Sequence, residues 1–156
     1  MSFSGAESAE FDLGIQAAQA GDLETAIELF RAVIERDPEH VEAHYKLGWV
    51  LGSQGFLDPA LRSFEQVVRL DPQHQEARYN LGAILLQKAQ LESVAPGQLD
   101  LDLLRQAQAA FKAVMEINAF DPKSLAMLNL IERAIVEAEK QGSRSESWLE
   151  TDTEPN

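Results

Sequence analysis

The residues best suited to bind a metal ion or to move a proton are the three histidines, His40, His44 and His74. His40 and His44 have the spacing of paired ligands on one face of a helix. His40 is expected to precede the helix, however, and no third ligand is indicated. A usable metal site needs three or more converging ligands. We therefore interpret the three as surface histidines and expect no metal site.

Other groups that carry catalytic chemistry are sparse. The chain has no cysteine, which excludes disulfides, thiol catalysis and cysteine-ligated zinc or iron–sulfur sites. Carboxylates are plentiful, but no pair stands in an apolar setting that would shift a pKa. Neither a phosphate-binding glycine loop nor a nucleophile elbow occurs. We expect no catalytic residue, no cofactor and no enzymatic activity.

The charge of the chain restricts its partners. The formal net charge is -13, and the basic residues are scattered singly, so nucleic-acid binding is not expected. Residues 1–10 lack the basic flank and apolar run of a signal peptide, and no stretch approaches the roughly 18 apolar residues that span a bilayer. A cytoplasmic protein that does not span a membrane is the resulting expectation.

The elements that position these side chains come from an internal repeat with a period of 34 residues. The first helix of each unit has an apolar stripe at helical spacing, and the second helix has another. An Asp-Pro pair ends the second helix and starts the next unit. The landmarks that recur at this interval are Leu13-Gly14, Leu47-Gly48 and Leu81-Gly82; Gly21 and Gly55; Ala26 and Ala60; Phe30 and Phe64; Val33 and Val67; and Asp37-Pro38 and Asp71-Pro72.

The glycines in this repeat have two expected roles. Gly14, Gly48 and Gly82 lie within the first helices, where each costs about 1 kcal/mol of helix propensity, so a small residue is wanted there for the close approach of a neighbouring helix. Gly21 and Gly55 lie where the first helices stop and suit a left-handed backbone.

These landmarks resemble the tetratricopeptide repeat, a pair of antiparallel helices with Leu-Gly, Ala, aromatic and Pro positions in this order. The resemblance covers residues 7 to 140. It implies an all-α fold: a right-handed superhelical array of three helical hairpins followed by a C-terminal capping helix. Two sets of residues depart from the family pattern, each exchanging one apolar residue for another. Ala17, Leu51 and Leu85 replace a frequent tyrosine, and Val33, Val67 and Val114 replace a frequent alanine.

The third unit is longer than the period requires, because Ala107 and Phe111 arrive 13 residues late. Its first helix is expected to continue through Leu91, before a turn at Pro96-Gly97 and a cap at Asp100 or Asp102. The helix after Asp121-Pro122 is expected to cap the array with a polar outer face. The predicted divisions are an N-terminal tail at 1–6, repeats at 7–40, 41–74 and 75–121 with an insertion at about 91–101, a capping helix at 122–140, and a disordered acidic tail at 141–156.

The resemblance also implies a concave groove, lined by the first helix of each unit, in which family members hold their ligands. In this chain the groove positions are apolar and aromatic, with two flanking glutamates. Tyr45 and Tyr79 also suit packing between adjacent first helices, whereas Trp49 stands where a polar residue is usual and favours binding. The predicted peptide-binding groove consists of Phe11, Ile15, Glu42, Tyr45, Trp49, Glu76, Tyr79, Ala83 and Leu86.

Some members of the family grip the acidic carboxyl terminus of cytosolic chaperones with lysine, asparagine and arginine. Here Phe11 and Ile15 occupy the first unit's places for lysine and asparagine, while Glu76 and Asn80 stand where the third unit would offer basic residues. Glu42 and Glu76 would repel an acidic ligand. An apolar or basic-amphipathic segment of another protein is therefore the expected partner.

The sequence thus predicts a non-enzymatic protein–protein interaction module, such as an adaptor, co-chaperone or assembly factor. It would bind a peptide or an amphipathic helix in an apolar, aromatic groove. The alternative is a self-associating structural module whose groove or capping helix is buried in a homo-oligomer. Two features stay open: the insertion is a tolerated loop or a lip of the groove, and Trp148-Leu149 is a docking motif or part of a plain disordered terminus.

Overall fold

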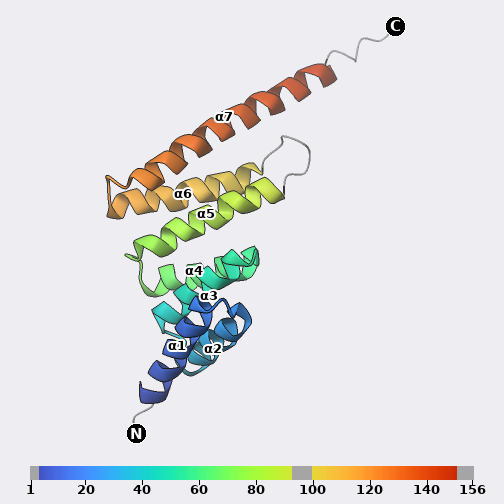
Figure 1. The fold of residues 1–156 in the computed structure, drawn as a ribbon. Coiled ribbons are helices and arrows are strands. Elements are labelled where there is room, and N and C mark those ends of the chain that lie inside the picture. Colours follow the sequence, from blue (N-terminus) through green and yellow to red (C-terminus); the bar gives the residue numbers. More distant parts are fainter. Residues whose placement is uncertain (1–3, 93–99, 151–156) are drawn as a thin grey trace. The chain divides into compact units, whose positions relative to one another are not determined.

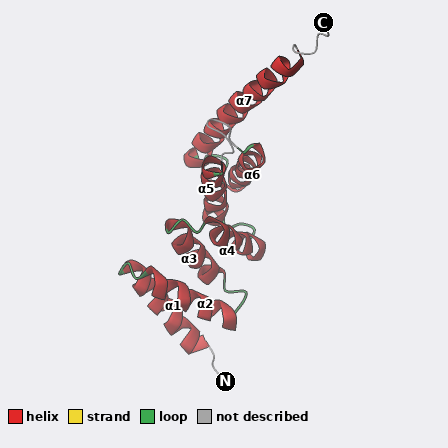
Figure 2. Ribbon diagram, turned by 90° about the vertical axis from the view of Figure 1, so that its right-hand side faces the viewer, coloured by secondary structure: helices red, strands yellow, loops and turns green. Residues whose placement is uncertain are grey.

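The computed structural model describes the backbone of residues 4–92 and 100–150, and the side chains of residues 8–92 and 100–140. Over these residues the chain is entirely helical and contains no strand, which confirms the predicted all-α class (Figures 1 and 2). The helices are α1 (Ser4–Gln19), α2 (Leu23–Arg36), α3 (Val41–Ser53), α4 (Leu57–Leu70), α5 (Gln75–Leu91), α6 (Leu101–Ile117) and α7 (Pro122–Glu150).

The helices form two compact units, and the boundary between them falls inside α5, after Ile84. In the first unit, α1 packs against α2 and α3 against α4, and α3 also packs against α2 (Figure 1). In the second unit, α6 packs against α7. Each of these six helices therefore contacts a neighbour in sequence, as expected of stacked helical hairpins.

The second helix of each hairpin buries one alanine, one phenylalanine and one valine in the core. Phe30, Phe64 and Phe111 are each 0–2% exposed, and the alanine and valine partners are all 0% exposed. Burying a phenylalanine side chain contributes about 1.5–3 kcal/mol of folding free energy. The set in the third hairpin lies 13 residues later than the 34-residue period requires, as noted from the sequence. The nine residues are Ala26, Phe30, Val33, Ala60, Phe64, Val67, Ala107, Phe111 and Val114.

Gly14, Gly21, Gly48 and Gly55 have the roles predicted for them. Gly21 and Gly55 have φ angles of 81° and 82°, in the left-handed region, and end α1 and α3. Gly14 lies against the ring of Phe30, because a Cβ there would be 2.8 Å from Cε1 of that ring. Gly48 faces Phe64 in the same way, at 3.1 Å. The missing side chains therefore let the paired helices approach.

The turns between hairpins repeat one hydrogen-bonding pattern. The backbone N–H groups of Asp37, Asp71 and Asn118 donate to the carbonyls of Val33, Val67 and Val114, which ends α2, α4 and α6. Three residues later, His40, His74 and Asp121 each accept a hydrogen bond from a backbone N–H of the next helix, at 3.1, 3.2 and 2.7 Å. A side chain that accepts in this way is an N-cap.

The third turn differs in register from the Asp-Pro pattern of the sequence. Asn118 takes the place of Asp37 and Asp71, because its side chain accepts a hydrogen bond from the N–H of Phe120 at 3.2 Å. Asp121 takes the place of the capping histidines. The helix after it also follows the pattern of a first helix, since Ser124 and Ile131 are 0% exposed, like Ala43 at 0% and Val50 at 1% in α3.

Several ends of elements can be compared with their predictions. α5 ends at Leu91, and Asp100 caps α6 by accepting from the N–H groups of Asp102 and Leu103, so both predictions are confirmed. Residues 93–99 of the expected insertion, including Pro96-Gly97, lie outside the described residues. α1 begins at Ser4, inside the segment 1–6 that was expected to be an N-terminal tail. α7 continues past residue 140 into the expected tail at 141–156 and ends at Glu150.

Two apolar surfaces differ from the sequence-based expectations. Leu13 is 51% exposed, although its equivalent Leu47 is 7% exposed, because α2 packs against α3 while no described helix precedes α1. On α7, Leu125, Leu130 and Val136 are 50%, 48% and 44% exposed, so the sides of this helix are less polar than a cap requires.

Gly14→Ala should destabilise the first unit by about 1–3 kcal/mol, because the new methyl group would collide with the buried ring of Phe30. Urea unfolding followed by circular dichroism measures this change. Gly52→Ala is the matched control, since its Cβ would chiefly meet the flexible end of Ile84, and it should be close to neutral. Equal losses in the two variants would contradict this account of Gly14.

His74→Ala should also destabilise the first unit, by about 1–2 kcal/mol, because it removes an N-cap acceptor and a ring that stacks on Tyr45. His74→Asn keeps a capping acceptor without the ring, and should recover part of the loss. The same unfolding experiment tests both variants. Indistinguishable stabilities of the Ala and Asn variants would show that the cap contributes little.

Candidate functional site

A hollow of about 270 Å³ lies between α1 and α3 in the first unit. Its walls are mainly apolar and aromatic, with one cation, Lys46, and one amide, Gln19. Three of the predicted groove residues, Ile15, Tyr45 and Trp49, line it. The full lining is Ile15, Ala18, Gln19, Phe30, Tyr45, Lys46, Trp49 and Val50.

Trp49 has the most exposed large apolar side chain in this lining. It is 52% exposed, whereas its neighbours Val50 and Leu51 are 1% and 4% exposed. α3 therefore buries the residues after Trp49 in the core and leaves the indole ring beside the hollow. An exposed tryptophan next to a hollow offers a large rigid contact area to a ligand.

Phe11 and Tyr45 are held by equivalent ring contacts, one repeat apart. The Phe11 ring lies 5.8 Å from that of Phe30 and 5.0 Å from that of His40, between ring centroids. The Tyr45 ring lies 5.8 Å from that of Phe64 and 4.9 Å from that of His74. This recurrence supports the packing interpretation given for Tyr45, and it shows that Phe11, predicted only as a groove residue, has the same kind of ring contacts. Tyr45 packs in the scaffold and also lines the hollow.

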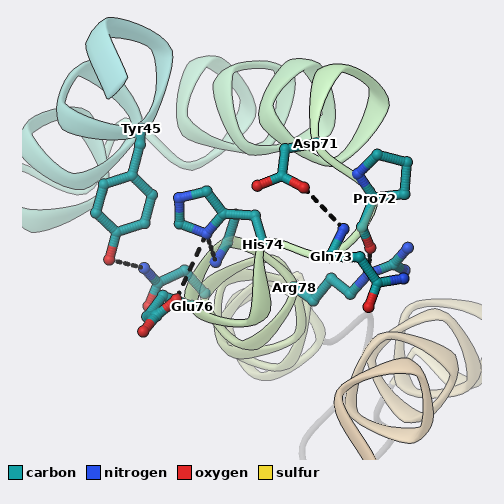
Figure 3. Close-up of polar contacts among 9 residues, drawn as sticks. Tyr45, Asp71, Pro72, Gln73, His74, Glu76 and Arg78 are labelled. Carbon is teal, nitrogen blue, oxygen red and sulfur yellow. Dashed lines mark hydrogen bonds and ion pairs between the residues drawn. The ribbon is translucent and has the colours of Figure 1, made fainter. Parts of the chain in front are cut away.

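Several polar side chains lie close to Tyr45 (Figure 3). The side-chain amide of Asn80 donates a hydrogen bond to the Tyr45 hydroxyl at 3.2 Å. A Glu76 carboxylate oxygen lies 3.6 Å from Nδ1 of His74, whose ring stacks on Tyr45. The Lys46 ammonium lies 5.6 Å from the centroid of the Tyr45 ring, within reach of a cation–π interaction.

Two carboxylates, Glu42 and Glu76, and one ammonium group, Lys46, lie near Tyr45. Burial raises the pKa of Tyr45 above its ordinary value, and the carboxylates of Glu76 and Glu42 raise it further. The hydrogen bond from Asn80 acts in the opposite direction.

The remaining predicted groove residues are distributed differently. Glu42 and Glu76 are exposed, and Tyr79 and Ala83 are partly buried. Leu86 is 9% exposed, so its side chain belongs to the core, and it lies in the second unit. None of these five lines the hollow.

Some residues near the site were missed by the sequence interpretation. Ala18 and Gln19 line the hollow, and their helical spacing from Ile15 is the signal that would have revealed them.

His44 is 9% exposed, so its assignment as a surface histidine was wrong. Its Nε2 lies 2.9 Å from the carbonyl oxygen of Pro38, and Arg78, one repeat later, donates to the carbonyl of Pro72.

The described side chains and helices form neither a metal site nor a membrane span. No group of three or more histidine and carboxylate side chains there is arranged to hold a metal ion. None of the described helices is long and apolar enough to cross a membrane.

Tyr45 should titrate above the ordinary tyrosine pKa, because burial and neighbouring carboxylates disfavour its anion. A folded-state pKa above the unfolded value stabilises the fold below the unfolded pKa, and this stabilisation is lost as pH rises through the folded pKa. Absorbance titration of Tyr79→Phe, which leaves Tyr45 as the one tyrosine, measures the midpoint. A midpoint at or below that of a free tyrosine would contradict this assignment.

Known structures share this fold. The first tetratricopeptide repeat domain of Spaghetti (RPAP3) bound to the HSP90 peptide SRMEEVD is 16% identical, with 85% of this chain and 95% of that chain covered and a TM-score of 0.71. MamA is 25% identical, with 81% and 67% covered and a TM-score of 0.68. The Yersinia enterocolitica type III secretion chaperone SycD, in complex with a peptide of the translocator YopD, is 18% identical, with 89% and 96% covered and a TM-score of 0.65.

No curated protein sequence matches the chain significantly. A family model does match: the one described as tetratricopeptide repeat aligns with residues 11–55 and 45–93, together more than half of the 156 residues. The 34-residue period, the paired helices and the buried Ala, Phe and Val landmarks are the features on which this match depends. The chain therefore belongs to the tetratricopeptide repeat family.

Proposed function

We propose that this protein is a non-enzymatic interaction module, an adaptor, co-chaperone or assembly factor, that holds a peptide or amphipathic helix of another protein against Trp49. The observation that carries the proposal is the 52% exposure of this side chain at the 270 Å³ hollow between α1 and α3. Hydrophobic anchors next to a concave surface are the residues that most often dominate binding free energy.

The chemistry of the hollow suggests which segment it would hold. Ile15, Trp49 and the edge of Tyr45 offer apolar contacts, so the ligand would place an aliphatic or aromatic side chain among them. Glu42 and Glu76 lie near Tyr45 and raise its pKa, which favours a cationic group at that end. The proposed ligand is therefore an apolar or basic-amphipathic segment.

The comparisons support a protein ligand in general terms, because two of the similar structures hold peptides: RPAP3 an HSP90 peptide and SycD a YopD peptide. An acidic ligand such as the HSP90 peptide SRMEEVD suits this chain poorly. Phe11 stands where a clamp lysine is expected, and its ring contacts Phe30 and His40. Asn80 is engaged with Tyr45. A cytoplasmic location remains a prediction from the sequence.

The experiment is selection of a random peptide library against the protein, followed by affinity measurements for the enriched peptides. Trp49→Ala should weaken their binding by about 30-fold or more, the effect of losing about 2 kcal/mol at a dominant anchor. Phe120→Ala removes another exposed aromatic ring, 92% exposed and outside the hollow, and should leave affinity unchanged. Equal affinities for the wild type and Trp49→Ala would refute the proposal.

Self-association is the alternative function, and the exposed Leu125, Leu130 and Val136 of α7 are the observation that favours it. Apolar side chains on a terminal helix are a surface that a second copy can cover. Sedimentation velocity over a range of concentrations separates the two functions. A monomer throughout removes the alternative, whereas a dimer that Leu130→Lys dissociates would support it.

A further inference from the structure

No helix among the described residues covers one side of α1, although the same side of α3 is buried. Leu13 is 51% exposed, and its equivalent Leu47 is 7% exposed because α2 packs against α3. Ala17 is partly buried, whereas its equivalent Leu51 is 4% exposed. The first hairpin therefore has an uncovered surface at the place where the second hairpin receives α2.

The extent of this surface follows from the second hairpin. A hollow of about 350 Å³ lies there where α2 meets α3 and α4, and those two helices contribute His44, Leu47, Leu51, Pro59, Arg62, Ser63 and Gln66 to its lining. The residues 34 positions earlier surround the uncovered side of α1. We call them the end face: Glu10, Leu13, Ala17, Thr25, Glu28, Leu29 and Ala32.

The end face is more apolar than the end of a helical array requires. The residue before the core phenylalanine is Leu29 in the first hairpin, whereas Ser63 and Ala110 precede it in the others. Ser63 and Ala110 are 7% and 8% exposed, and the larger Leu29 is only partly buried. Gln16, in place of the buried Val50, makes one edge polar. A terminal repeat needs a polar outer surface for solubility, so exposed leucines there indicate a contact with another chain.

Carboxylates outnumber basic groups on the two helices that form the end face. Glu10 and Arg36 form an ion pair with each other. Arg31 lines hollows on the α4 side of α2, and Lys46 of α3 lines the Trp49 hollow on the other side of α1. The balance of charge at the end face is therefore acidic. The described charged side chains of α1 and α2, with the N-cap of α2, are Glu10, Asp12, Asp22, Glu24, Glu28, Arg31, Glu35 and Arg36.

The second hairpin shows which charges a covering helix brings to such a surface. Arg62 is the equivalent of Glu28, and α2 brings Glu35 to the hollow that Arg62 lines. Asp12 likewise stands where the second hairpin has Lys46. Because the charges of the end face are reversed relative to the second hairpin, a helix that covers the end face would carry basic residues.

The apolar side chains of α2 give the spacing that such a helix needs. Ile34 lines the 350 Å³ hollow, and Ile27 lines a neighbouring hollow of about 670 Å³ that α3 also borders. These two residues are seven apart and so lie on the same side of α2. A helix that covered the end face in the same way would have aliphatic side chains at i and i+7.

We propose that the end face is a docking surface for a helix of a partner protein, with aliphatic side chains at i and i+7 and basic residues beside them. On α1 this helix takes the place that α2 takes on α3. A second copy of this chain does not fit, because its own α2 is packed against α1 and α3 and each copy has a net charge of -13.

This surface is separate from the Trp49 hollow. Leu13 and Ile15 are about 200° apart around α1, and Ile15 lines that hollow, so the two sites lie on opposite sides of the helix. The proposal for the end face therefore does not depend on the function proposed for the hollow.

The probe is a fluorescein-labelled peptide with the sequence of residues 22–37, in which Glu24, Glu28 and Glu35 are replaced by lysine. It keeps Ile27 and Ile34 and is basic. The control peptide also carries Ile27→Gln and Ile34→Gln. Fluorescence anisotropy with the full chain should show binding of the first peptide only, because the control peptide keeps the charge without the aliphatic contacts.

Two variants of the protein test the site. Leu13→Gln should weaken binding of the probe by about tenfold or more, and the exposure of Leu13 lets the variant fold, which circular dichroism checks. Glu28→Arg should weaken binding at low ionic strength and by less at high ionic strength. Phe56→Ala removes another half-exposed apolar side chain, outside the end face, and should leave the affinity unchanged.

Unchanged affinity in both Leu13→Gln and Glu28→Arg would overturn the proposal. A loss confined to Trp49→Ala would also overturn it, because that result places the peptide in the Trp49 hollow. Sedimentation velocity covers the remaining case. If the probe does not bind and Leu13→Gln only dissociates a dimer, a second copy covers the end face and the proposal is wrong.

Discussion

The packing of one phenylalanine ring against a glycine of the partner helix is the constraint on which the hairpins depend. Phe30 and Phe64 are almost fully buried, and Gly14 and Gly48 have no side chain that would collide with them. Each glycine lowers helix propensity by about 1 kcal/mol, a smaller effect than the burial of the ring, about 1.5–3 kcal/mol. The close approach of the two helices follows from this balance.

The turns between hairpins transmit this arrangement from one repeat to the next. His40 and His74 cap α3 and α5. The His40 ring contacts Phe11 in a tilted arrangement, and the His74 ring stacks on Tyr45, each on the preceding first helix. One side chain thus starts a helix and fixes its position against its neighbour. Asp121 performs the capping part at the start of α7, where a carboxylate replaces the imidazole.

α3 contributes residues to hollows on two of its sides. Trp49 and Tyr45 line an aromatic hollow of about 270 Å³ with α1, while Leu51 lines a hollow of about 670 Å³ between α2 and α4. Charges of both signs stand near each hollow. Glu42, Glu76 and Lys46 lie near Tyr45, and Glu24, Glu28 and Arg31 line the second hollow.

Much of the fold was predictable because the repeat encodes it locally. The all-α class, the roles of Gly14, Gly21 and Gly55, the end of α5 at Leu91 and the cap at Asp100 all follow from periodicity and turn chemistry. The site was predictable only in part. The family resemblance implied that Ile15, Tyr45 and Trp49 face one groove, and the structure brings these three together at one hollow.

The sequence by itself determined the helices and their pairing, because those depend on interactions between residues close along the chain. Tertiary structure decided the rest. Leu13 and Leu47 occupy equivalent positions, yet the first is exposed and the second buried, since α2 packs against α3 and no helix among the described residues packs in that way against α1. The hollow between α2 and α4 likewise requires two second helices at a definite separation, and a linear pattern does not contain the distance between helices that are distant in sequence.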